Sequence, residues 1–170
     1  MTPNEGLGQK MDGREYRYLA KWWLGRRLFE GRNVACPCCE KTMDSYGDHL
    51  VSCEFNQPVA RHNALRDALA HALKEVGIAC QKEVAIGGAR RPADLALPNL
   101  DQRGPTAIDL VVHHPLRPSA ARGFRGADER RSLRQAEEEK RAESEELCHG
   151  HGWMFAPMGW HTWGGVGPHQ

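Results

Sequence analysis

The feature that most constrains this chain is a cluster of thiols and one imidazole near its N-terminus. Two residues separate Cys36 from Cys39, three separate His49 from Cys53, and nine lie between the two pairs. Two short ligand pairs joined by a loop are the usual way in which a chain assembles a tetrahedral zinc site. Four protein ligands close such a site, so we predict a structural zinc module rather than a catalytic one.

Another thiol competes for one of the four positions. Cys36 and Cys38 form a cramped pair with a single residue between them, and we therefore predict that Cys39 and not Cys38 is the ligand. Cys80 and Cys148 lie outside the cluster and are predicted to be buried or free thiols. Thiols held in a metal site favour a reducing, intracellular compartment.

The composition excludes some classes of protein and leaves others open. A chain of 170 residues suits one domain of ordinary size with a small added module. No run of about 18 apolar residues is present, so we expect no membrane-spanning helix, and the first residues lack the apolar core of a secretory signal. The net charge is only +1. Basic residues gather in 1–35 and 117–134, where a phosphate-facing surface and a solvated helix face are both compatible with the pattern.

Hydrophobic periodicity predicts an α/β core. The predicted elements are a basic amphipathic helix over 14–29, a helix over 58–76, strands over 82–86, 93–97 and 106–112, a helix over 128–148 and a strand over 153–158. This order predicts a mixed sheet flanked by helices. The expected organisation is a leader and basic helix in 1–35, a zinc module in 36–57 and the core in 58–170.

The first two helices carry further predictions. Tyr16, Leu19, Trp23 and Leu24 are expected to dock the basic helix on the rest of the protein. Gly77 is expected to end the helix over 58–76, because glycine readily adopts the left-handed conformation found after helix ends.

A different metal arrangement uses other residues. Asp48, His49, Asn63 and His71 follow the order of an HNH nuclease site, in which histidines and a carboxamide hold one metal. That motif needs a strand between its first histidine and its helix, and none is predicted here. We therefore expect His71 to lie on the solvent face of its helix.

Two aspartates interrupt short apolar strands, where an unpaired charge is costly to bury. A solvent-facing position would explain either Asp94 or Asp109 alone. The turn over 98–105 should make their strands antiparallel neighbours, so the two carboxylates can converge. Paired carboxylates suit Mg²⁺ or Mn²⁺, and such an ion could polarise a phosphodiester and activate water. Glu83 is a candidate third acid.

These residues together resemble the restriction-like endonuclease region of site-specific non-LTR retrotransposons, a branch of the PD-(D/E)XK nucleases. The matching features are CPxC…GDHxxxC, RHNxLRDxL at 61–69, RPAD ending at Asp94, the acid in AIDLVV, and a helical lysine, Lys140. The resemblance covers about three quarters of the chain. It implies a PD-(D/E)XK core with a zinc module at its N-terminal side.

The resemblance also implies an activity and its residues. Asp94 and Asp109 would bind the catalytic Mg²⁺ or Mn²⁺. Lys140 would replace the lysine usually found two residues after the second acid, where this chain has Val111. Family members commonly have tyrosine at the position of Ser144. The implied activity is nicking or cutting target DNA to leave a 3′-hydroxyl that primes reverse transcription, with DNA, a reverse transcriptase domain or element RNA as partners and a nuclear location.

The orientation of Lys140 follows from spacing without the family. Residues four and seven positions away are Ala136, Leu133, Ser144 and Leu147, which are small or apolar. They should form the stripe that packs on the sheet, so the lysine amine is expected to reach the two aspartates.

Two functions remain open on the sequence. The first is a metal-dependent DNA endonuclease, with Arg61, Arg90, Arg91 and the arginines within 117–134 as candidate DNA contacts. The second is a zinc-stabilised nucleic-acid-binding module without catalytic activity. The aspartates and the lysine separate them, because binding alone would not require this set.

Overall fold

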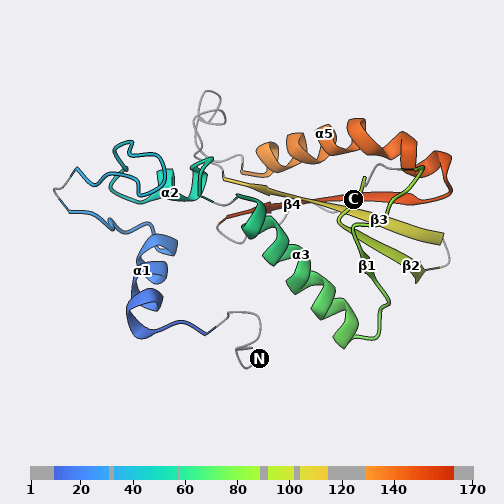
Figure 1. Ribbon diagram of the computed structural model, residues 1–170, viewed down its shortest axis with the longest axis horizontal. Helices are drawn as coiled ribbons and strands as arrows, with labels where there is room; N and C mark the ends of the chain where they lie inside the picture. Colours follow the sequence, from blue (N-terminus) through green and yellow to red (C-terminus); the bar gives the residue numbers. More distant parts are fainter. Residues whose placement is uncertain are drawn as a thin grey trace. The chain divides into compact units, whose positions relative to one another are not determined.

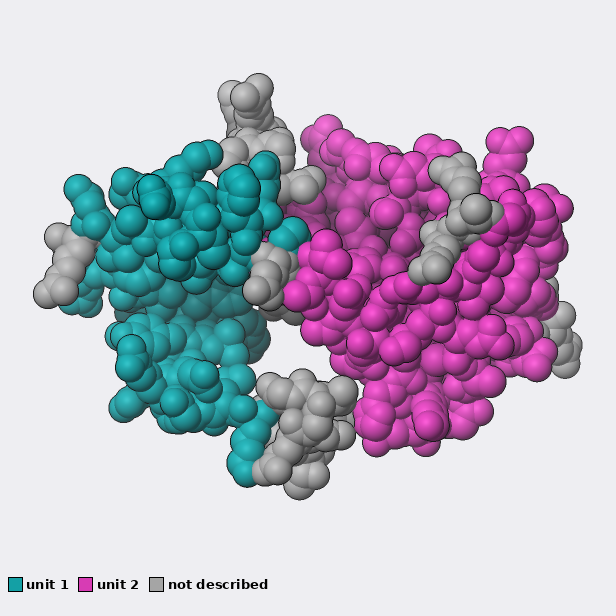
Figure 2. Space-filling model, viewed as in Figure 1, with its two compact units in different colours: residues 1–58 teal, residues 59–170 magenta. Residues whose placement is uncertain are grey.

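The computed structural model describes residues 10–30, 33–56, 58–88, 92–101, 104–114 and 129–162. The chain forms two compact units, Met1–Pro58 and Val59–Gln170, which Figure 2 colours separately. No helix among the described residues combines the length and the apolar character needed to cross a bilayer.

Helix α1, Gly13–Trp23, opens the first unit. Asp12 and Glu15 form a capping box. The side chain of Asp12 accepts a hydrogen bond from the backbone N–H of Glu15, and the side chain of Glu15 accepts one from the backbone N–H of Asp12. The helix ends well before Phe29, so the predicted length is wrong. Gly25 has a φ of 62° and begins a left-handed C-terminal cap that the helical periodicity does not reveal.

The apolar side chains of α1 do not pack as expected. No residue of this helix is buried, and Tyr16, Leu19, Trp23 and Leu24 are all exposed. Within the first unit these side chains do not dock the helix, so the prediction is wrong for contacts inside this unit.

The core of the first unit is built around thiols. Its buried members are Cys36, Met43 and Cys53, with Phe29 and Leu50 packed at its margin. Helix α2, Asp48–Ser52, is short, and a single antiparallel bridge joins residues 35 and 42. So small an apolar core leaves this unit dependent on a further source of stability.

The second unit contains a four-stranded mixed sheet in the order β1-β2-β3-β4. Its strands are β1 Gln81–Lys82, β2 Leu95–Asp101, β3 Gly104–His113 and β4 Met154–His161. The first three strands are antiparallel neighbours, and β4 runs parallel to β3. A parallel pair needs a long crossover, and helix α5, Glu129–Gly150, lies in the segment that joins these two strands. The predicted order of one helix, three strands, a helix and a strand is confirmed.

Helices cover both faces of this sheet (Figure 1). Leu95, Leu97, Ile108 and Leu110 form one buried cluster, against which the leucines of α3, Pro58–Glu75, pack. Successive residues of a strand point to opposite faces. The alternate residues of β3 and β4 therefore face α5. They include Ala107 and Phe155, which cluster with Cys148 of that helix. The prediction of a mixed sheet flanked by helices is confirmed.

The strand boundaries differ from the predicted ones at two places. Strand β1 spans two residues instead of five, because Glu83 has a φ of 52°, which is incompatible with an extended strand. Strand β2 continues through the first half of the predicted turn, with a register shift between Leu97 and Asp101. Pro98 lies within that shift, where its missing N–H interrupts the ladder at little cost.

Helix α3 ends close to its predicted position. Gly77 has a φ of 78°, its N–H donates to the carbonyl of Lys74, and the N–H of Ile78 donates to the carbonyl of Leu73. These two bonds make the cap that satisfies the last carbonyls of a helix, so the predicted role of the glycine is confirmed.

Candidate metal centres and active site

The four predicted zinc ligands lie together in the first unit. One ligand atom from each of Cys36, Cys39, His49 and Cys53 lies within 4.8 Å of all the others. The Sγ atoms of Cys36 and Cys53 are 3.9 Å apart, and Cys39 Sγ lies 3.2 Å from His49 Nε2. Usual Zn–S and Zn–N bond lengths give tetrahedral edges of about 3.3–3.8 Å. Three thiols and one imidazole at this spacing could therefore bind zinc.

Backbone amides hold the first thiol of this cluster. Burial raises the pKa of Cys36, but hydrogen bonds from the backbone N–H groups of Cys38 and Cys39 outweigh it and lower the pKa to about 6. Only the thiolate is a metal ligand, so these bonds favour the binding form. The side chain of Cys38 is exposed and lies outside the cluster. The ligand set of the structure is the predicted one.

A single carboxylate orients the histidine. Asp44 Oδ2 accepts from the backbone N–H of His49 at 2.6 Å, and its Oδ1 accepts from those of Tyr46 at 2.8 Å and Asp48 at 3.1 Å. Burial raises the pKa of Asp44, but these hydrogen bonds outweigh it and keep the pKa low. The aspartate thus fixes the loop that presents His49 to the thiols.

The histidines of the alternative HNH order have other partners. His49 belongs to the cysteine cluster, whereas His71 is exposed on α3 and pairs with Glu75 at 3.2 Å. The predicted solvent-facing position of His71 is confirmed.

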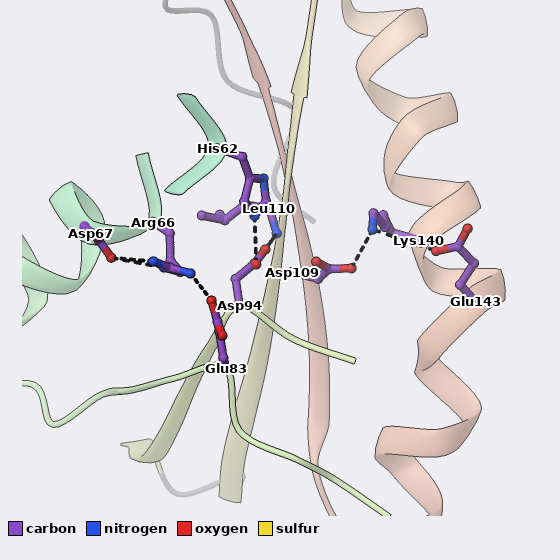
Figure 3. A network of polar contacts seen from close by, with 9 residues as sticks. All are labelled: His62, Arg66, Asp67, Glu83, Asp94, Asp109, Leu110, Lys140 and Glu143. Carbon is purple, nitrogen blue, oxygen red and sulfur yellow. Dashed lines mark hydrogen bonds and ion pairs between the residues drawn. The ribbon is translucent and has the colours of Figure 1, made fainter. Parts of the chain in front are cut away.

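The two aspartates of the second unit converge (Figure 3). Asp94 directly precedes β2, and its N–H donates to the carbonyl of Ile108 at 2.9 Å, one residue before Asp109. Figure 3 shows the two carboxylates near each other on the sheet, and each shifts the pKa of the other. The predicted antiparallel pairing brings them to one place, as expected.

Donors from two different elements hold the carboxylate of Asp94. His62 Nε2 on α3 lies 2.8 Å from Oδ1, and the backbone N–H of Leu110 on β3 donates to Oδ2 at 2.7 Å. Burial raises the pKa of Asp94, but the bonds to His62 and Leu110 outweigh it and lower the pKa. The same contact raises the pKa of His62. Asp94 is therefore an ionised carboxylate with a fixed orientation.

Asp109 has a different electrostatic environment. The residue is only 8% exposed, and burial raises the pKa of its carboxyl to about 6. The neighbouring charge of Asp94 acts in the same direction, while the ammonium of Lys140 opposes it. Two carboxylates this close repel each other when both are ionised, which favours the protonated form of Asp109.

Lys140 supplies one positive charge at this site. Its Nζ lies 3.2 Å from Asp109 Oδ2 and 3.8 Å from Glu143 Oε2. Leu133, Ala136 and Ser144 of the same helix are buried, as the predicted stripe requires. Burial lowers the pKa of the lysine, but the charge of Asp109 outweighs it and raises the pKa. The predicted orientation of Lys140 toward the aspartates is confirmed.

Glu83, the candidate third acid, has a different partner. Its carboxylate forms an ion pair with Arg66, which also contacts Asp67 at 3.0 Å. Its backbone N–H donates to the carbonyl of Asp94 at 2.9 Å, so its main chain reaches the site. Figure 3 shows the side chain of Glu83 pointing toward Arg66. Its role as a third acid stays a prediction.

His62 and Arg66 are polar residues of the site that the sequence prediction missed. They are one helical turn apart on α3, and the same stripe continues through Leu69 and Leu73, which pack against the sheet. Arg66 is 7% exposed. An apolar stripe that continues into a histidine and an arginine is the pattern that could have revealed them.

The candidate DNA contacts lie partly outside the described residues. Arg61 is half-buried in the first turns of α3, and Arg131 and Arg134 are exposed near the start of α5. Arg90, Arg91 and the loop over 115–128 lie outside the described residues. Contact of these arginines with DNA stays a prediction.

No protein-family model matches this chain, and no curated protein or solved structure matches it either.

Proposed function

We propose that this protein is a metal-dependent endonuclease that hydrolyses a phosphodiester bond of DNA. The observation that carries the proposal is the convergence of Asp94 before β2, Asp109 on β3 and Lys140 on α5. A mixed sheet flanked by helices is also what the resemblance to PD-(D/E)XK nucleases implies for the core. Its partners would be DNA and, as in target-primed retrotransposition, a reverse transcriptase domain or element RNA in the nucleus.

Asp94 and Asp109 would hold the catalytic Mg²⁺ or Mn²⁺. Both offer carboxylate oxygens, the ligands that these ions prefer. Asp94 is ionised because its pKa is lowered, and a bound cation would stabilise the ionised form of Asp109, whose pKa is raised. A divalent ion there would polarise the phosphate and lower the pKa of the attacking water.

Lys140 would act on the reacting atoms from the α5 side. Its ammonium is charged, because Asp109 raises its pKa, and it is fixed at 3.2 Å from that carboxylate. A fixed positive charge can orient the attacking water and offset the negative charge that develops on the scissile phosphate. An ordinary solvated lysine would need neither this burial nor this partner.

The second candidate is a zinc-stabilised nucleic-acid-binding module. The observations that favour it are the cysteine–histidine cluster and the exposed helix α1, whose basic residues Arg14, Arg17 and Lys21 alternate with exposed aromatic side chains. Such a module would bind DNA and leave its backbone intact. The polar cluster of the second unit would then have no role.

Replacement of Lys140 by alanine tests the proposal. We expect the single-turnover rate of nicking of supercoiled plasmid with Mn²⁺ to fall about 100- to 1,000-fold, because one preorganised charge near the phosphate is lost. Arg141→Ala is the matched control, since this neighbouring cation pairs with Glu145 on the same helix and should retain the wild-type rate.

Zinc content and DNA affinity should remain unchanged in both variants. Equal nicking rates for wild-type and Lys140→Ala protein would show that the lysine is only a structural partner of Asp109. Plasmid binding without nicking by the wild-type protein, in Mg²⁺ and in Mn²⁺, would favour the binding module.

A further inference from the structure

His62 lies on α3 and contacts a carboxylate of the proposed active site, that of Asp94. Its imidazole lies 2.8 Å from Asp94 Oδ1, across 32 positions of the sequence. The fold does not explain this choice of residue, because Leu65, Leu69 and Leu73 on the same helix face pack on the sheet as apolar side chains.

The contact completes the orientation of Asp94. One oxygen of its carboxylate is bound by the N–H of Leu110 at 2.7 Å, and a carboxylate held at one oxygen can still rotate about that bond. His62 contacts the second oxygen at 2.8 Å, and two contacts, one at each oxygen, leave the carboxylate a single orientation. In that orientation the carboxylate lies beside Asp109, as Figure 3 shows.

The pair of aspartates is contacted from two helices. His62 of α3 contacts Asp94, and Lys140 of α5 contacts Asp109 at 3.2 Å. The two helices lie on opposite faces of the sheet, so each supplies one nitrogen donor to one carboxylate of the pair. Neither donor blocks a cation, because each carboxylate oxygen has two lone pairs and one remains available after a single hydrogen bond.

We infer that His62 is a positioning residue that fixes Asp94 in the orientation in which both aspartates can bind one divalent cation. This inference rests on the proposed function, since it assigns the role of His62 toward that metal. Carboxylate ligands of metals are commonly held by hydrogen bonds from outside the coordination shell. Loss of such a partner typically costs 10- to 100-fold in metal affinity or activity.

The test compares His62→Gln with His62→Asn. Both variants are polar and uncharged, and both are suited to a half-buried position. The terminal amide of glutamine extends about as far as Nε2 of histidine, whereas that of asparagine is too short to reach Asp94 Oδ1. His71→Ala is the matched control, because this exposed histidine lies on the same helix and pairs only locally with Glu75.

Mn²⁺ binding is measured by the loss of the electron paramagnetic resonance signal of free Mn²⁺, on zinc-loaded protein. Asp94→Ala defines the binding that belongs to this site. We expect His62→Asn to weaken Mn²⁺ binding about 10- to 100-fold, while His62→Gln and His71→Ala stay within a few-fold of wild type. The Mn²⁺ concentration that gives half-maximal nicking should rise by the same factor in His62→Asn, with the rate at saturating Mn²⁺ largely restored.

Two results would overturn the inference and are distinct from each other. Equal Mn²⁺ affinity of His62→Asn, His62→Gln and wild type, with Asp94→Ala losing the site, would remove the positioning role and leave the metal site standing. Mn²⁺ binding that is the same in wild type and Asp94→Ala would remove the proposed metal site and the inference with it.

Discussion

Asp109→Asn should abolish cleavage and at the same time stabilise the fold. The substitution removes one carboxylate of the proposed metal site, so we expect nicking to fall about 1,000-fold or more. The side chain keeps nearly the same shape and can still accept a hydrogen bond from Lys140. Burial and the charge of Asp94 raise the pKa of this carboxyl to about 6, which means that its ionised form costs free energy in the folded state. At neutral pH the variant should therefore gain about 1–3 kcal/mol in free energy of unfolding.

The pH dependence follows from the same shift. Above a pH of about 6 the carboxyl of Asp109 is ionised in the folded and the unfolded chain, and the full cost is present. As the pH falls from about 6 to about 4, the folded chain takes up the proton first and the cost disappears. The difference in stability between Asp109→Asn and wild type should thus be full above pH 6 and vanish near pH 4.

Chemical denaturation at several pH values measures this difference. Asp67→Asn is the matched control, because hydrogen bonds from Lys82 and Arg66 outweigh desolvation and lower the pKa of that carboxyl. The same substitution there should bring no gain in stability. Loss of stability in Asp109→Asn at neutral pH would show that Lys140 more than offsets the cost of burying this charge.

Cys39→Ser should release the zinc and unfold the first unit. Structural zinc contributes about 10–16 kcal/mol to small zinc modules at neutral pH, and the buried core of this unit consists of two ligand thiols and Met43. Elemental analysis is expected to find one zinc per chain in wild-type protein and none in the variant. Limited proteolysis should then cut within the first unit and spare the second.

Cys38→Ser is the control for the ligand choice. The thiol of Cys38 is exposed and lies outside the cluster, so its replacement should leave zinc content and protease resistance unchanged. Retention of zinc by Cys39→Ser together with its loss from Cys38→Ser would reverse the assignment.

Most of the core could be predicted from the sequence because its strands and helices carry regular apolar patterns. The pairing of β2 with β3 follows from the short turn between them, and α5 is marked by its small and apolar stripe. The backbone conformation of Gly77 was predictable, but that of Gly25 and of Glu83 was not. The left-handed φ of Gly25 shortens α1, and that of Glu83 shortens β1. Hydrophobic periodicity does not change at either residue, so the pattern does not predict these ends.

The candidate site was predictable where charge breaks an apolar pattern. Asp94, Asp109 and Lys140 all interrupt such patterns, and the structure brings them together. His62 was missed because its partner is 32 positions away and meets it only when α3 packs on the sheet. A contact between residues so far apart in the sequence depends on tertiary packing. The spacing of residues within one helix or strand does not predict it.

Conversion of supercoiled plasmid by wild-type protein and by Asp94→Ala, purified side by side, tests whether the two aspartates form an active site. Mg²⁺ and Mn²⁺ are compared with EDTA, and zinc content is checked after each reaction. We predict that the wild-type protein nicks or linearises the plasmid only with a divalent ion. Asp94→Ala should bind the plasmid with similar affinity and lose about 1,000-fold or more of the rate. Equal conversion by both proteins would show that cleavage arises outside the pair of aspartates and that they are not the active site.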